Sequence, residues 1–410
     1  MRAIYSRYVL LCFTLASALV FADPPSLERA KTALAAGNEN AALPALQAVL
    51  KTQPNNLFAL GNAGLICARK GQLLLAAQYL ARAHRLQPKD LQLGLALLEV
   101  YARSGRNQEA EQVTADLRAG GKLSSNQIRS AATLLFRSGN LKAAAAMAAD
   151  DPVDGVLRHD LLASIFTAMG DVQKASDEFQ ESIRLDPDND KRYFQLGMLY
   201  LKYRTPSLAV LVFGHGLQRQ PNSALLWLGL GVSQALDEKL ELSEVSLHRA
   251  IELNPRFTDA YLLLGDILEQ EKPREALAIF RRTMEQHPDL AIAYYYYGRL
   301  TLLLNEGSKE DTIAVLRNAV KLEPSFADSH YELGRALEQS GKVNEAITEF
   351  EESLRLNPKL FRAHYRLALL YKKRGDFAKA DLALKTFQQA RQSDDPDLEI
   401  KRLEYEIKQP

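Results

Sequence analysis

Aromatic and basic residues recur together in the last third of the chain. Three tyrosines stand 36 and 34 residues apart, and four arginines accompany them. Phenol rings combine a large apolar surface with a polar tip, and guanidinium groups form paired hydrogen bonds with carboxylates. These types at this spacing are typical of a surface that binds an acidic peptide. The set is Tyr295, Tyr331, Tyr365, Arg299, Arg335, Arg362 and Arg366.

No motif for catalysis or cofactor binding accompanies them. The sequence contains no HExxH, CxxC, GxSxG or P-loop pattern. Gly229 and Gly231 form a GxG, but the third glycine and the preceding strand of a dinucleotide site are missing. His159, His330 and His364 occupy the same apolar position of a repeat described below, which favours packing over metal binding. We therefore expect no catalytic residue, no metal and no cofactor.

Composition and charge are those of an ordinary globular chain. Of 410 residues, 47% are hydrophobic and 25% charged. Without residues 1–22 the chain has 49 Lys and Arg against 50 Asp and Glu, a net charge of −1. Nucleic-acid binding calls for a basic stripe, so we expect no nucleic-acid partner. Cys67 is then the single cysteine, and no intramolecular disulfide can form.

The first 22 residues have the pattern of a secretory signal peptide. Arg2 and Arg7 flank the start of an apolar run from Tyr8 to Phe21, and Val-Phe-Ala ends the run at Ala22. A retained membrane anchor is the alternative, but an apolar run of about 14 residues is short for a bilayer. We expect export to a periplasmic or extracellular space, from a bacterium, with no membrane span after cleavage.

Residues 23–410 repeat with a period near 34. Prolines that close short polar turns are spaced by 33 to 36 residues, with one gap of 99. One unit reads ADSHYELGRALEQSGKVNEAITEFEESLRLNP from 327 to 358, with Gly334 at position 8, Ala346 at 20, Phe350 at 24 and Pro358 at 32. Small residues at 8 and 20 let two helices cross closely. The six glycines that follow a first helix favour left-handed caps: Gly71, Gly105, Gly139, Gly170, Gly341 and Gly375.

This pattern resembles the tetratricopeptide repeat family over nearly all of residues 23–410. The resemblance implies an all-α, right-handed superhelical solenoid of about eleven helix-turn-helix units, ten of them starting near residues 57, 91, 125, 156, 190, 224, 258, 291, 327 and 361. AADDPVDG shortens the second helix of one unit, which predicts a kink near 149–155. We expect a signal peptide (1–22), two repeat segments (23–151 and 156–391) and a polar capping helix (396–410).

Helical periodicity then divides the four tyrosines of AIAYYYYGRL. Positions 4, 7, 8 and 11 share one stripe of the first helix, and positions 2, 5, 6 and 9 lie about 200° away. Tyr294 and Tyr297 are expected in the core, and Tyr295 and Tyr296 on the concave groove of the family. The same reading assigns the following residues to the groove: Tyr295, Tyr296, Arg299, Tyr331, Arg335, Arg362, Tyr365, Arg366, Phe194, Met198 and Leu228.

The function implied is a scaffold that binds a protein or peptide partner, as an extended or helical and acidic segment. Among the positions of the family's two-carboxylate clamp, only Arg362 and Arg366 match, so a chaperone-tail clamp is not supported. Four alternatives stay open: packing without a ligand, a purely structural spacer, an enzyme with a cryptic site, and a module that assembles exopolysaccharide or outer-membrane machinery.

Overall fold

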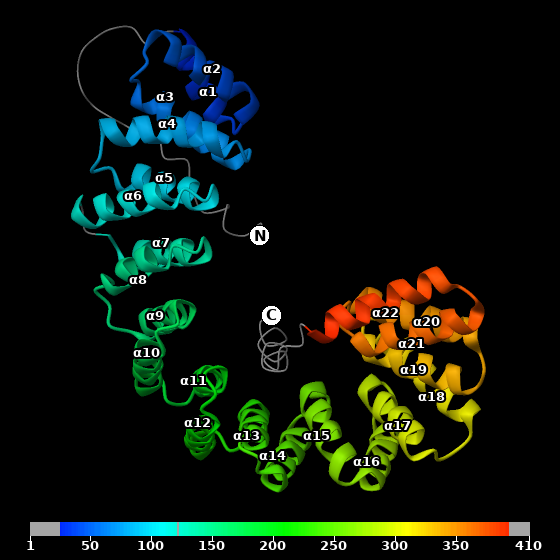
Figure 1. Ribbon diagram of the computed structural model, residues 1–410. Coiled ribbons are helices and arrows are strands. Elements are labelled where there is room, and N and C mark those ends of the chain that lie inside the picture. Colours follow the sequence, from blue (N-terminus) through cyan, green and yellow to red (C-terminus); the bar gives the residue numbers. More distant parts are fainter. Residues whose placement is uncertain (1–24, 121–122, 393–410) are drawn as a thin grey trace. The chain divides into compact units, whose positions relative to one another are not determined.

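The computed structural model describes residues 25–120 and 123–392, and every regular element in these ranges is an α-helix (Figure 1). The described residues divide into two compact units between Asp186 and Pro187. The expected signal peptide and the expected capping helix lie outside the described residues, and both stay predictions.

The first compact unit contains ten helices. They are α1 (Pro25–Ala35), α2 (Glu39–Thr52), α3 (Leu57–Arg69), α4 (Leu73–Leu86), α5 (Leu91–Arg103), α6 (Asn107–Gly120), α7 (Ser125–Arg137), α8 (Leu141–Ala149), α9 (Val156–Met169) and α10 (Val172–Leu185). Polar side chains start several of them: Asn56 Oδ1 accepts a hydrogen bond from the Ala59 N–H, and Ser124 with Gln127 forms a capping box at α7.

The second compact unit contains twelve helices among its described residues. They are α11 (Asp190–Lys202), α12 (Pro206–Arg219), α13 (Ala224–Leu236), α14 (Leu240–Leu253), α15 (Thr258–Glu271), α16 (Pro273–Gln286), α17 (Ala291–Leu304), α18 (Lys309–Leu322), α19 (Ala327–Gln339), α20 (Val343–Leu356), α21 (Phe361–Arg374) and α22 (Phe377–Gln392). The helices are joined by short turns and pair along the chain, first with second, third with fourth (Figure 1).

The predicted repeat register is confirmed. Each of the ten predicted unit starts is the first residue of an odd-numbered helix, from Leu57 of α3 to Phe361 of α21. We call the first helix of each pair the A helix and the second the B helix. The described part of the chain thus forms eleven helix pairs, an all-α tetratricopeptide-type solenoid.

The A and B helices of a pair cross where the small residue of position 8 meets the large residue of position 24. A Cβ atom on Gly334 would lie 2.8 Å from the Phe350 ring, which is fully buried. This distance is shorter than van der Waals contact, so only glycine leaves room for the ring. The same pairing recurs at Gly64–Leu80, Gly197–Phe213, Gly231–Leu247 and Gly298–Leu316.

The turn after each A helix uses the left-handed backbone conformation that the sequence predicts. All six predicted cap glycines have positive φ, between 69° and 89°. Three other units place Arg204, Glu238 and Asn305 at the same position with φ of 52° to 59°. The turn geometry is therefore a property of the repeat, and glycine only makes it less costly.

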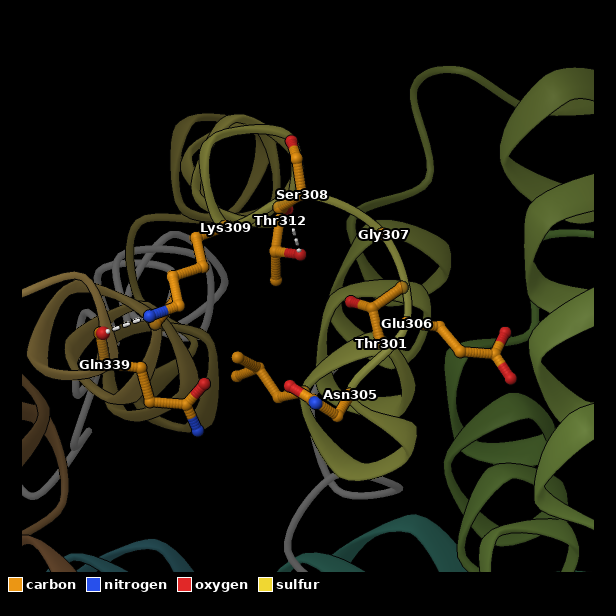
Figure 2. Close-up of a pocket in the computed structure, with 10 residues that line it drawn as sticks. Thr301, Asn305, Glu306, Gly307, Ser308, Lys309, Thr312 and Gln339 are labelled. Carbon is orange, nitrogen blue, oxygen red and sulfur yellow. Dashed lines mark hydrogen bonds between the residues drawn. The ribbon is translucent and has the colours of Figure 1, made fainter.

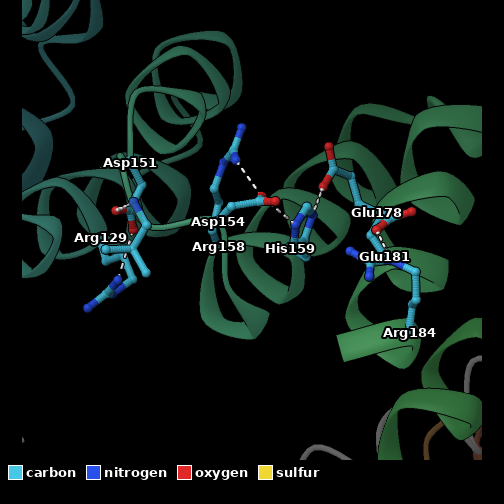
Figure 3. A network of polar contacts seen from close by, with 9 residues as sticks. Arg129, Asp151, Asp154, Arg158, His159, Glu178, Glu181 and Arg184 are labelled. Atoms are coloured by element: carbon cyan, nitrogen blue, oxygen red, sulfur yellow. Dashed lines mark hydrogen bonds and ion pairs between the residues drawn. The ribbon is translucent and has the colours of Figure 1, made fainter. Parts of the chain in front are cut away.

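The second helix of the unit that begins at Ser125 is short, as AADDPVDG predicts. This helix, α8, has nine residues, whereas α10 has fourteen. The connection to α9 is held by polar contacts. Arg129 Nη1 lies 2.9 Å from the buried Asp151 Oδ2, and Asp151 Oδ1 accepts from the Val153 N–H (Figure 3). A kink of the stack near 149–155, and a segment boundary there, stay predictions.

Two glycine substitutions should change stability in opposite directions. Gly334→Ala should lower the free energy of unfolding by about 1–3 kcal/mol, because the new methyl group overlaps the Phe350 ring. Gly214→Ala, within α12, should raise it by about 0.5–1 kcal/mol, because no atom lies within 4 Å of its Cβ position. Thermal and urea unfolding of both variants measure the difference. Equal effects would contradict the assigned helix crossing.

Candidate partner-binding surface

The four consecutive tyrosines of α17 lie the other way round from the prediction. Tyr295 and Tyr296 are buried, with 3% and 0% of their surface exposed, whereas Tyr294 and Tyr297 are half-buried. The prediction that Tyr295 and Tyr296 face an open groove is therefore wrong. The error has a physical reason in the way neighbouring units pack.

An A helix packs against the neighbouring units as well as against its own B helix. Tyr296 faces the preceding unit: its hydroxyl donates to the Leu262 carbonyl (2.6 Å), and its ring stacks on Phe280 at 4.6 Å. Tyr295 faces the following unit, where the Phe326 ring meets it edge-on at 4.9 Å. Positions 5 and 6 are therefore covered wherever another unit follows. Burial raises the pKa of both phenols well above the usual range.

Arg299 is held by the same packing and is not free for a ligand. Its Nη1 donates to the Tyr295 hydroxyl at 2.7 Å, and its Nε lies 2.7 Å from Glu269 Oε2 of α15. Although burial opposes charge, the Tyr295 hydroxyl and Glu269 hold the pKa of Arg299 above its ordinary value. The arginine thus links two successive A helices as part of the fold.

The other predicted groove residues before α21 are also packed. Tyr331 is 8% exposed and lies 5.6 Å from the Phe350 ring. Arg335 Nη1 donates to Glu332 Oε2 at 2.7 Å, and burial raises the pKa of that glutamate. In α11 and α13, Phe194 and Leu228 are core residues with 4% and 1% exposure, and Met198 is half-buried. An open groove at these positions is not present.

The last unit differs, because α21 has an uncovered face among the described residues. Six of its residues lie at i, i+3, i+4, i+7, i+10 and i+11, a single stripe of a helix. Tyr365 and Leu369 are each 44% exposed, although both have large apolar surfaces. We call this surface the α21 stripe, and it consists of Arg362, Tyr365, Arg366, Leu369, Lys372 and Lys373.

The cations of the α21 stripe have few acidic neighbours. Arg366 Nη1 lies 3.4 Å from Glu338 Oε2 of α19, a long contact. Arg362 lies 5.9 Å from the Phe361 ring, and within the described part of the chain it forms no ion pair. Lys372 and Lys373 are exposed and likewise unpaired within residues 25–120 and 123–392. Tyr365 rests against Phe387 of α22 at 5.3 Å. Three of the eleven predicted groove residues thus share an accessible surface: Arg362, Tyr365 and Arg366.

The charge of the individual units distinguishes this surface. Residues 361–392 contain eight Lys and Arg against two Asp and Glu, a net charge of +6. The preceding unit, 327–360, contains four against seven, a net charge of −3. The near-zero total conceals this contrast. Counting charge unit by unit would have pointed to Leu369, Lys372 and Lys373 together with the predicted residues.

No cavity in the described residues has the dimensions of a small-molecule site. Figure 2 shows a pocket between the α17–α18 turn and α19, lined among others by Asn305, Ser308 and Gln339. Its volume of about 20 Å³ suits one water molecule. A hollow of about 530 Å³ beside the α4–α5 turn is lined by Gln87, Pro88, Lys89 and Asp90 alone. Within residues 25–120 and 123–392, no cluster of three His, Cys, Asp or Glu could hold a metal ion.

Two of the three position-4 histidines connect the A and B helices of their own units. His159 Nδ1 lies 2.6 Å from Glu178 Oε2, and its Nε2 lies 3.0 Å from Asp154 Oδ1 (Figure 3). His330 Nδ1 lies 2.7 Å from Glu349 Oε2, and its Nε2 3.1 Å from the Pro324 carbonyl. Both rings are buried, as predicted for packing residues. In each ring both nitrogens face oxygen acceptors, an arrangement that suits the doubly protonated imidazolium.

Comparison with known families agrees with the helix pairs. Models described as tetratricopeptide repeat match residues 27–90, 159–189, 259–289 and 361–394, and one described as TPR repeat matches 334–375. The chain belongs to the tetratricopeptide repeat family. Such repeats bind protein partners, and the chain is a protein-binding scaffold.

Tetratricopeptide relatives match much of the chain at low identity. Human "Protein O-mannosyl-transferase TMTC3" is 24% identical over 319 residues, covering 75% of this chain and 32% of that protein. "TPR repeat-containing protein MJ1428" of Methanocaldococcus jannaschii is 24% identical over 408 residues, covering 85% of this chain and 66% of its own length. The chain thus spans less than two thirds of either relative. The crystal structure of yeast Tom70 aligns with a TM-score of 0.47 at 13% identity, over 92% of this chain and 93% of that one.

The helices were also compared with the requirements of a membrane span. Among the described residues, no helix combines the length and the apolar character needed to cross a bilayer.

Replacing a buried and an exposed tyrosine should separate packing from surface. Tyr296→Ala should lower the free energy of unfolding by about 3–5 kcal/mol, because it empties the space between Phe280 and Gly265. Tyr365→Ala, at an equally repeated but uncovered helix face, should cost about 0.5 kcal/mol. Urea unfolding of the two variants provides the comparison, and a similar loss in both would contradict the burial described above.

Stability should depend on pH in opposite senses through His330 and His364. Although burial lowers it, the hydrogen bonds to Glu349 and the Pro324 carbonyl raise the pKa of His330 in the folded chain, above about 6.5 when unfolded. Its contribution is therefore complete below pH 6.5 and is lost as pH rises through the folded pKa. Burial lowers the pKa of His364, so its contribution is present above pH 6.5 and lost as pH falls through its folded pKa.

The measurement is urea unfolding of wild type, His330→Gln and His364→Gln between pH 5 and 8.5. Relative to wild type, His330→Gln should cost most at the acidic end, on the order of 1–3 kcal/mol for the lost charged hydrogen bond. His364→Gln should cost most at the basic end. A His330→Gln penalty that does not vary with pH would contradict the protonated state.

Proposed function

We propose that the chain is an exported, non-catalytic scaffold that binds an acidic segment of a protein partner along the α21 stripe. The supporting observation is the contrast between units. Tyr295 and Tyr331 are buried at position 5, whereas Tyr365 at the same position is 44% exposed beside unpaired cations in the described part of the chain. Exposed aromatic and apolar surface within a basic rim is typical of a protein interface.

The stripe favours a particular chemistry in its partner. Arg362 at one end and Lys372 and Lys373 at the other lie about 15 Å apart along a helix that rises 1.5 Å per residue. Tyr365 and Leu369 lie between them. A partner helix or extended segment with acids at both ends and apolar residues between them fits this order. Exposed ion pairs contribute about 0–1 kcal/mol each, so Tyr365 and Leu369 supply the remaining affinity.

Export and a role in cell-envelope complexes are part of the proposal. They rest on the signal-peptide pattern of residues 1–22, with its apolar run and its exit at Ala22. In that setting the scaffold takes part in the assembly or maintenance of envelope complexes. The absence of catalytic motifs in the sequence supports a non-catalytic role. The activity named for the human relative belongs to a protein of which this chain spans 32%.

The test is site-specific photocrosslinking in the cell. A benzophenone amino acid replaces Tyr365 in the full chain, and in a control it replaces Arg282, an exposed residue of α16 that pairs with no described residue. Irradiation should yield a partner adduct from position 365 alone, and its crosslinked peptide should carry net negative charge. The adducted chain should fractionate with the envelope and begin at Asp23.

Charge variants make the crosslinking result quantitative. Arg362→Glu with Lys373→Glu should reduce the adduct about tenfold, since two reversed contacts of about 1 kcal/mol each exceed the 1.4 kcal/mol of a tenfold change. Arg282→Glu with Lys321→Glu changes the net charge equally in the same compact unit and should leave the adduct unchanged. Equal loss in both pairs, or adducts of equal yield from positions 365 and 282, would contradict binding at the stripe.

A further inference from the structure

The α21 stripe is the face that a following unit would cover. In the unit before it, Tyr331 is 8% exposed because α21 follows, and in the unit before that the Phe326 ring covers Tyr295. The corresponding Tyr365 is 44% exposed within the described residues. The packing rule of the repeat therefore specifies what should lie here: the chain that comes next after α22.

The chain that comes next has complementary chemistry. Residues 393–410 contain six Asp and Glu against three Lys and Arg, a net charge of −3, and residues 361–392 have +6. Ile400, Leu403 and Ile407 stand at i, i+3 and i+7, the spacing of one helical face. A helix over 396–410 would be about 22 Å long, close to the roughly 21 Å of α21.

The position of α22 brings this segment to the stripe without a linker. The Phe387 ring lies 6.2 Å from Phe361 and 5.3 Å from Tyr365, so the C-terminal part of α22 runs beside the first turns of α21. Gln392, where α22 ends, is five residues beyond Phe387. Residues 394, 395 and 397, all aspartates, thus enter at the Arg362 end of the stripe.

We infer that the acidic segment 393–410 occupies the α21 stripe of its own chain and competes there with the partner. This inference rests on the proposed function, because it assigns a built-in competitor to the same surface. A tethered segment acts at an effective concentration in the millimolar range for a short connection. A partner must therefore exceed that local concentration of competitor, which restricts binding to segments that match the stripe better than residues 393–410 do.

The first experiment uses a fluorescein-labelled synthetic peptide with the sequence of residues 393–410 as probe. Its binding to the full chain is measured by fluorescence anisotropy, for wild type and for Leu403→Asp with Ile407→Asp. The altered chain should bind the probe at least tenfold more tightly than wild type, because its own segment no longer occupies the stripe. Adding Arg362→Glu and Lys373→Glu should abolish this gain, and adding Arg282→Glu and Lys321→Glu should leave it intact.

Equal probe binding by wild type and the altered chain, including no binding by either, would overturn the inference. A second measurement does not depend on the tail variant. The purified full chain with benzophenone at position 365 should crosslink to its own residues 393–410, as seen by mass spectrometry of the monomer. If the tail fails both measurements while a partner adduct forms in cells, the proposed function stands alone. If the tail passes both and no partner adduct forms, the segment is only a structural cover, and the competition fails together with the proposed function.

Discussion

The packing of each A helix against the A helix of the next unit is the constraint on which this structure depends. Tyr296 reaches back to the Leu262 carbonyl, and Tyr295 is covered by Phe326 of the unit that follows. A side chain on these positions is thus exposed only where the array stops. The consequence is that surface chemistry in the second compact unit is concentrated at its last helix pair, and the interior of the array is occupied by contacts between units.

The polar residues of the A helices serve the same packing. Arg299 contacts Tyr295 on its own helix and Glu269 on the preceding A helix, and Arg335 neutralises the buried Glu332. A buried charge without a partner is costly, so these pairs favour one register of unit on unit. Residues that look like a ligand site in the sequence are therefore the residues that hold neighbouring units in place.

The last unit reverses this economy. Its A helix has cations without acids nearby in the described residues, and apolar side chains without a covering helix. The net charge of +6 over residues 361–392 would repel another basic surface and attract an acidic one. The same physical features explain an external acidic partner and the chain's own residues 393–410 as occupants, which is why the two are expected to compete.

The sequence by itself determined the helix pairs, their ten starting residues and the left-handed turns, because these depend on local periodicity and on the size of single residues such as Gly334. It also identified Arg362, Tyr365 and Arg366. Tertiary structure decided which of the eleven groove residues are accessible, and it assigned Tyr295, Tyr296, Tyr331, Phe194 and Leu228 to the core. The reason is that helical phase gives the direction of a side chain, whereas its exposure depends on whether another unit lies in that direction.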